Sequence, residues 1–268
     1  MIIIASKNRE TKYLIMDILS LLYIATLSWV YIFPLNFDSI TYKFIFAMFF
    51  VPLTALSSYY SSPGQAQTTS VLCISILGFY TLGGPLYFWP LHLILPIFFT
   101  YAIGHFKWNG FKLNDVLPTQ LQWKSDFGWS VVIGLCAASV VTIWSHIAHP
   151  DLSDIRELLL SGHSALILAI AGCLFSVCNS ILEEFVWRGT LLPWLRQVFP
   201  TPVAILIQAL SFGAAHWHGL PSGLSGACLA TLFGMLLGFI TVYRKNLFAP
   251  ILAHCFADIA VFAILIWG

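Results

Sequence analysis

Stretches of about twenty apolar residues recur along the whole chain, and each is long enough to cross a hydrocarbon core of roughly 30 Å as an α-helix. This pattern limits the fold more than any other feature of the sequence. Helices are the expected form because lipid offers the backbone no hydrogen bonds, and the alternating pattern of a barrel strand is absent from the sequence. The sequence therefore predicts an all-α fold, a polytopic transmembrane bundle of about eight or nine helices.

The expected spans cover residues 13–33, 42–60, 68–82, 85–104, 127–147, 163–189, 202–217, 222–243 and 248–267. The region 68–104 makes either two crossings around Leu82–Pro85 or one crossing with a re-entrant segment. Two crossings place most basic loop residues on the side of the N-terminus and leave only Lys43 and Arg156 opposite. We therefore expect a multi-pass membrane protein with a cytoplasmic N-terminus.

Composition supports this class and excludes others. The 268 residues are 59% hydrophobic and 9% charged, against roughly one quarter charged in soluble domains. The net charge of +1 argues against a nucleic-acid partner, so the lipid bilayer is the first expected partner. The six cysteines lie in apolar runs without CxxC spacing and are interpreted as reduced packing residues. No repeat or linker is apparent, and we expect a single membrane domain over residues 1–268.

The C-terminal third concentrates ionisable side chains at membrane depth. The segment ILEEFVWRGT, residues 181–190, places Glu183, Glu184 and Arg188 inside one apolar span. A charge at the bilayer centre costs about 2.5 to 3.5 kcal/mol on insertion scales, so its presence needs a partner or a function. Two later spans carry the other candidates, His216, His254 and Asp258.

Helical spacing separates the two glutamates. Glu184 and Arg188 are four residues apart with the acid first, which is the favoured order for an ion pair on one helix face. Glu183 points about 100° away and has no such partner. We therefore assign Glu184 and Arg188 to structure and orientation, and Glu183 to proton transfer.

The later candidates also lie in pairs at helical spacing. Phe212 and His216 are four residues apart, and so are His254 and Asp258, so each pair projects from one helix face. Helical rise places Glu183 about 20 Å, His216 about 22 Å and His254 about 14 Å from the same predicted inner side. The three groups can therefore meet in one buried chamber. A stripe of small residues would let a neighbouring helix approach closely: Gly226, Ala230, Gly234 and Gly238. This stripe indicates helix packing and says nothing about function.

Three motifs on three apolar segments resemble one family. EEFVWR (residues 183–188) looks like EExxxR, FGAAH (212–216) like FxxxH, and HCFAD (254–258) like HxxxN or HxxxD. Together they resemble the CPBP family, the type II CAAX prenyl endopeptidases and their bacterial relatives, also called the Abi family. The resemblance covers about residues 165–265, and we expect the catalytic core within 163–268.

This resemblance implies an intramembrane glutamic endopeptidase acting on a membrane-associated protein or peptide. Glu183 would activate the attacking water with the help of His216, while His254 and residue 258 would stabilise the oxyanion. Asp258 stands where the prenyl-protein enzymes usually have Asn. An ionised Asp cannot donate to an oxyanion, so Asp258 is either protonated or orients His254. Bacterial members with substrates other than CAAX proteins are therefore the better comparison, which implies a bacterial inner (cell) membrane.

Two alternatives accompany this interpretation. Glu183, His216 and His254 are ligand types suited to a catalytic zinc ion, although no HExxH motif is present. The resemblance favours a mechanism without a metal or other cofactor. Alternatively, the buried polar cluster belongs to a non-enzymatic transporter or a bacteriocin-immunity protein. The paired broken helices expected of many transporters are not visible in the sequence.

Overall fold

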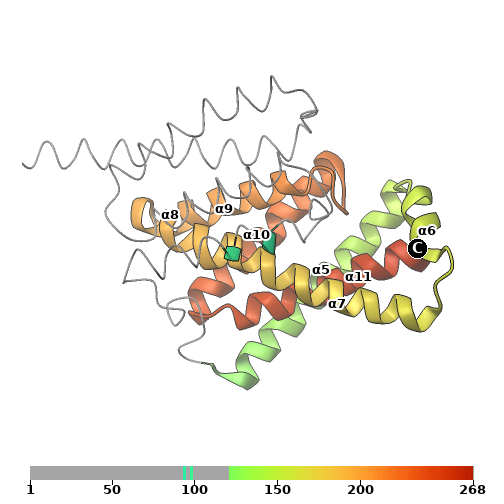
Figure 1. Cartoon of the computed structure of the whole chain (residues 1–268). Coiled ribbons are helices and arrows are strands. Elements are labelled where there is room, and N and C mark those ends of the chain that lie inside the picture. Colours follow the sequence, from blue (N-terminus) through green and yellow to red (C-terminus); the bar gives the residue numbers. More distant parts are fainter. Residues whose placement is uncertain (1–92, 95–96, 99–120, 268) are drawn as a thin grey trace, which may run out of the picture. The chain divides into compact units, whose positions relative to one another are not determined.

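The computed structural model describes residues 93–94, 97–98 and 121–267. The long segment 121–267 is mainly helical (Figure 1). No strand occurs in the described ranges. The elements are α5 (Trp123–Ala148), α6 (Ser153–Leu160), α7 (Ala165–Glu184), the π-helix η4 (Phe185–Leu191), α8 (Leu192–Val198), α9 (Thr201–Ala215), α10 (Gly223–Arg244) and α11 (Phe248–Trp267).

Four helical segments are long and apolar enough to cross a membrane: Trp123–Ala148, Ala165–Leu191, Gly223–Arg244 and Phe248–Trp267. They confirm the predicted all-helical, multi-pass class and agree with four of the expected spans. The span expected at 202–217 is instead the fifteen-residue α9, shorter than the roughly twenty residues that a full crossing takes. The first four expected spans lie outside the described residues, apart from two short pieces. The total of eight or nine spans and the side of the N-terminus stay predictions.

The chain forms two compact units, and all the candidate residues lie in one of them, residues 113–192 and 205–268. Residues 193–204, with most of α8 and the start of α9, belong to the other unit. Within them, the side chain of Arg196 donates to Oγ1 of Thr201 at 3.4 Å. The expectation of one membrane domain over the whole chain stays a prediction.

Local side chains define where several helices begin and end. Ser164 is the N-cap of α7, and its hydroxyl accepts a hydrogen bond from the backbone N–H of Ile167. The Asn246 side chain accepts from the N–H groups of Phe248 and Ala249, which would otherwise lack partners in the first turn of α11. Lys245 ends α10 in the left-handed conformation. The resulting turn reverses the chain sharply between α10 and α11.

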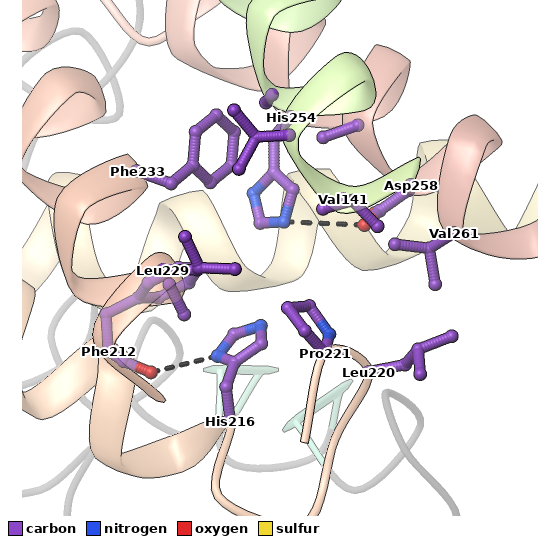
Figure 2. Close-up of a pocket in the computed structure, with 14 residues that line it drawn as sticks. Val141, Phe212, His216, Leu220, Pro221, Leu229, Phe233, His254, Asp258 and Val261 are labelled. Atoms are coloured by element: carbon purple, nitrogen blue, oxygen red, sulfur yellow. Dashed lines mark hydrogen bonds and ion pairs between the residues drawn. The ribbon is translucent and has the colours of Figure 1, made fainter. Parts of the chain in front are cut away.

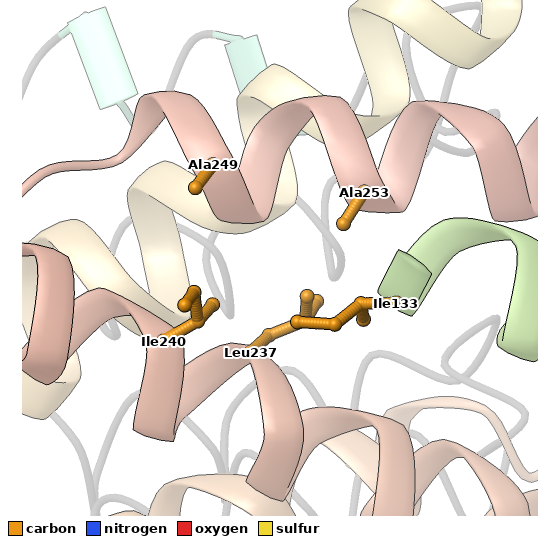
Figure 3. Close-up of a cluster of buried hydrophobic side chains, with 5 residues drawn as sticks. All are labelled: Ile133, Leu237, Ile240, Ala249 and Ala253. Carbon is orange, nitrogen blue, oxygen red and sulfur yellow. The ribbon is translucent and has the colours of Figure 1, made fainter. Parts of the chain in front are cut away.

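Helix α11 is the centre of the larger unit and packs against α5 and α7. One core cluster joins α5, α10 and α11 through the buried residues Ile133, Leu237, Ile240, Ala249 and Ala253 (Figure 3). The two alanines on α11 let the larger side chains of α5 and α10 approach its backbone. This packing fixes the face of α11 that carries His254, the residue following Ala253.

Glycines allow α9 and α10 to approach closely. A Cβ atom added at Gly238 would lie 2.7 Å from Nε2 of Gln208, and one at Gly234 would lie 3.2 Å from the Cα of Ala209. On α9, a Cβ added at Gly213 would collide with the side chain of Thr231. The predicted small-residue stripe on α10 is therefore a packing surface, and it brings the α9 residues Gln208 and Phe212 next to the charged segment described below.

Candidate active site

The three charges of the EExxxR segment are buried where α7 changes into η4. Glu183 and Glu184 are 0% exposed and Arg188 is 1% exposed. From Phe185 the chain winds as a π-helix, and the hydroxyl of Thr190 donates to the carbonyl of Phe185 at 2.9 Å. π-Helical segments often lie at functional sites. The sequence predicted a regular helix here, because the wider winding has no pattern of its own.

Arg188 is held by three neighbours. Its guanidinium donates to Oε1 of Glu184 at 2.8 Å, which confirms the predicted ion pair. It also donates to the carbonyl of Gly234 on α10 at 3.3 Å, an oxygen that the Gln208 amide reaches at 2.9 Å. The Phe212 ring lies beneath the guanidinium at 4.3 Å, within the range of a cation–π contact. Phe212 thus packs against the charged segment.

Glu184 has a second partner that spacing along the chain did not predict. The same oxygen, Oε1, lies 2.8 Å from Nδ1 of His254, seventy residues away on α11. A carboxylate oxygen can only accept, so Nδ1 carries the proton and donates. The Glu184 carboxylate therefore joins Arg188 to His254 and fixes one edge of the imidazole.

The opposite edge of the His254 ring faces two more carboxylates. Its Nε2 lies 3.6 Å from Oε2 of Glu183 and 3.6 Å from Oδ1 of Asp258. These separations exceed a direct hydrogen bond but are short for a charged interaction. The structure thus brings Glu183, Glu184, His254 and Asp258 together. The imidazole donates its close hydrogen bond to Glu184. The sequence interpretation considered only Asp258 for orienting the ring.

Asp258 has a partner on α7 that the sequence interpretation passed over. The amide Nδ2 of Asn179 donates to Oδ2 of Asp258 at 3.0 Å, and both side chains are buried. Asn179 precedes Glu183 by four residues, so the two lie on one face of α7. That spacing was visible in the sequence, but nothing indicated that this face meets Asp258.

Glu183 differs from the other charged residues of the site. Neither carboxylate oxygen has a hydrogen-bond partner among the described residues, although both are buried. Native structures satisfy most buried polar groups, so an orphaned carboxylate needs an explanation such as a bound water or a role in chemistry. Glu184 Oε2 and Arg188 Nε are also without partners in the described part of the chain. The site is therefore polar enough to hold water.

A small cavity of about 60 Å³ has His216 and His254 on opposite walls (Figure 2). Phe212 and Asp258 also line it, whereas Glu183 and Glu184 lie outside its lining. One water molecule needs about 10 to 15 Å³ of cavity volume, so the cavity has room for a few water molecules. His216 Nδ1 lies 2.9 Å from the carbonyl of Phe212. Since a carbonyl only accepts, Nδ1 donates, and Nε2 of the neutral ring keeps its lone pair. The remaining lining is mainly apolar: Ala137, Val140, Val141, Leu220, Pro221, Leu229, Phe233 and Val261 among others.

Phe212 contacts both imidazoles. Its ring centroid lies 4.4 Å from that of His216 and 5.7 Å from that of His254. Within the ranges that the structure describes, no three His, Cys, Asp or Glu side chains are grouped so as to hold a metal ion. Nδ1 of each histidine is engaged in a hydrogen bond, to Phe212 and to Glu184. The zinc alternative is left to experiment.

Helices of membrane-spanning length surround a buried carboxylate and two histidines. The protein therefore belongs to the class of multi-pass membrane proteins with an internal polar site. Residues 165–260 match the family model described as Type II CAAX prenyl endopeptidase Rce1-like. This segment is thus an Rce1-like region of the CPBP family, which confirms the resemblance found in the motifs and supports a membrane peptidase. No curated protein and no solved structure gives a significant match to the chain.

Proposed function

We propose that this protein is an intramembrane endopeptidase of the glutamic type that hydrolyses a peptide bond in a membrane-associated protein or peptide. The Rce1-like region supports the peptidase class. The observation that carries the finer assignment is Glu183, a buried carboxylate with no hydrogen-bond partner among the described residues, 3.6 Å from the His254 ring. It is available to accept a proton, whereas Glu184 already accepts from Arg188 and His254.

The proposed reaction begins with a water between Glu183 and His216. Glu183 takes a proton from the water as general base, while Nε2 of His216 accepts the second hydrogen and orients the oxygen. The water oxygen forms a bond to the carbonyl carbon, and the negative charge develops on the carbonyl oxygen. Nε2 of His254 donates to this oxyanion, with its ring fixed at Nδ1 by Glu184. The C–N bond then breaks, and Glu183 returns its proton to the leaving amine.

Asp258 acts in this scheme through His254. An ionised Asp258 cannot donate to the oxyanion, but its Oδ1 lies 3.6 Å from Nε2, near enough to orient the imidazole. Glu184 and Asp258 thus hold the ring at its two edges. This arrangement supports the orienting role for Asp258.

The test compares protein termini in membranes of cells producing the wild-type protein or Glu183→Gln. The substitution keeps the shape of the side chain but removes the base, and general bases contribute about 10²- to 10⁴-fold to rates. We expect new termini, identified by mass spectrometry, in the wild type alone. Equal numbers of these termini with Glu183→Gln would refute the proposal. Proton-coupled uptake into vesicles that persists in His254→Ala would instead favour a transporter.

Metal removal tests the zinc alternative. We expect the purified protein to keep its full cleavage rate after dialysis against EDTA and 1,10-phenanthroline, because the proposed base is a carboxylate and not a metal-bound water. The assay uses a synthetic peptide spanning the strongest cleavage site from the comparison of termini. Loss of activity that zinc alone restores would replace the glutamic mechanism with a metal-dependent one.

A further inference from the structure

Asn179 lies one helical turn before the catalytic candidate Glu183 and is 4% exposed. Its Nδ2 donates to Oδ2 of Asp258 at 3.0 Å. The other oxygen of the same carboxylate, Oδ1, lies 3.6 Å from Nε2 of His254. The two oxygens of Asp258 therefore have different neighbours, one an amide donor on α7 and the other the imidazole on its own helix.

This hydrogen bond limits the rotation of a side chain that would otherwise have freedom. Asp258 is four residues beyond His254, and a short carboxylate on a helix can turn about its Cα–Cβ and Cβ–Cγ bonds. An amide donor at Oδ2 selects the orientation in which Oδ1 faces the ring. Hydrogen bonds to charged groups are stronger than those between neutral groups, so the selection is effective.

We propose that Asn179 is a positioning residue of the active site: its amide holds Asp258 so that the second carboxylate oxygen faces Nε2 of His254. This inference rests on the proposed function. It adds a residue of α7 to the His254–Asp258 pair. Helix α7 then acts on Nε2 of His254 in two ways: Glu183 lies near this nitrogen directly, and Asn179 holds the carboxylate of Asp258 near it.

The experiment measures kcat and KM for Asn179→Leu, which keeps the branch at Cγ but has no donor. The probe is the synthetic peptide spanning the strongest cleavage site found in the comparison of termini. We expect kcat to fall about 10- to 100-fold, corresponding to a hydrogen bond to a charged group, with KM changed less than about threefold. Asn179→Asp, which opposes two acceptors, should lower kcat at least as much.

Ser176→Ala is the matched control. Ser176 is also buried on α7, but its hydroxyl donates within the helix to the carbonyl of Gly172 at 2.8 Å. The Ser176→Ala substitution should leave kcat, KM and the thermal midpoint unchanged. A folding defect in Asn179→Leu would appear as a lower thermal midpoint, and the isosteric Asn179→Asp then provides the second measurement.

Nitrogen-15 NMR of histidine side chains gives a readout that packing alone would not move. The His254 signals are assigned by their loss in His254→Gln. We expect the Nε2 signal to shift in Asn179→Leu and to stay in place in Ser176→Ala. An unshifted Nε2 signal with kcat within about twofold of wild type would overturn the inference. A lower kcat with an unshifted signal would also overturn it, because it would indicate a packing role.

The same series separates this inference from the function on which it rests. If Glu183→Gln produces the wild-type termini, the proposed function fails and Asn179 has no reaction to support. If Glu183→Gln is inactive while Asn179→Leu matches the wild type in rate and in the His254 spectrum, only the role of Asn179 fails.

Discussion

Two buried charged clusters lie in the same compact unit, and they differ in how completely their hydrogen bonds are made. In the first, Asp126 at the start of α5 accepts from Arg244, from the Asn246 amide and from the backbone N–H of Gln122. Arg244 also donates to the Gln122 side chain. In the second, Glu183 has no hydrogen-bond partner among the described residues for either oxygen.

This difference indicates what each cluster is for. The Asp126 cluster ties together the start of α5, the end of α10 and the start of α11, and its carboxylate is fully used in doing so. A saturated buried network specifies structure, whereas groups left without partners cost stability and persist where they serve another purpose. The cluster around Glu183 contains such groups without partners. Changes in the Asp126 cluster should therefore affect stability, and changes in the Glu183 cluster should affect activity.

Asp126→Asn should have the largest effect on stability. It leaves the buried part of Arg244 without its carboxylate, and breaking a buried pair costs about 3 kcal/mol or more. Thermal unfolding in detergent should reveal the loss, while cleavage per folded molecule is unchanged. Glu183→Gln is the counterpart, with activity lost and the thermal midpoint equal or higher. If both variants lose stability to the same degree, the comparison between the clusters is wrong.

Gly226→Ala should have an intermediate effect and alter both properties. The added Cβ would collide with the backbone of Pro221, which cannot rotate away as a side chain can. Overpacking of this kind costs roughly 1 to 3 kcal/mol. Because Pro221 lines the cavity beside His216, the cleavage rate should fall as well. Gly128→Ala on the exposed face of α5 is the control, since its Cβ meets no atom within 4 Å. A Gly226→Ala protein as stable and active as this control would contradict the close approach of Pro221 to Gly226.

Arg156→Ala should have the smallest effect. Arg156 on α6 donates to the last carbonyls of α11, those of Leu265 and Ile264, each at 3.1 Å. The site is part-buried, so the loss of stability should be about 1 kcal/mol, with no change in cleavage rate. This loss of stability is measured by thermal unfolding of Arg156→Ala, with Arg156→Lys, which keeps the charge, as the comparison. A loss of activity here would extend the functional region to the end of α11.

Relations within one helix could be predicted from the sequence. Glu184 and Arg188 form the predicted pair because helical spacing alone brings them together. The span expected at 222–243 agrees with α10 to within one residue at each end, because lipid imposes a minimum length on the apolar run. The identity of the segment 165–260 was also visible, because its motifs combine charged residues with spacings that apolar packing does not require.

Relations between helices could not be predicted in the same way. The hydrogen bond from His254 to Glu184 joins residues seventy positions apart, and that from Asn179 to Asp258 joins residues seventy-nine apart. Both depend on which faces of α7 and α11 meet. Asp126 illustrates the same limit, because it precedes the span expected at 127–147 and only the packed helix ends bring Arg244 to it.

The carbonyl oxygen of Gly234 has a consequence for mutational mapping. It accepts from both Arg188 and Gln208, so α10 supports the charged segment with a main-chain oxygen. Alanine scanning would register Gly234 as a crowded position and leave the oxygen in place. An ester in place of the peptide bond after Gly234 weakens the acceptor without adding an atom to the seam between α9 and α10. That replacement, and not a change of side chain, would measure what α10 contributes to the charged segment.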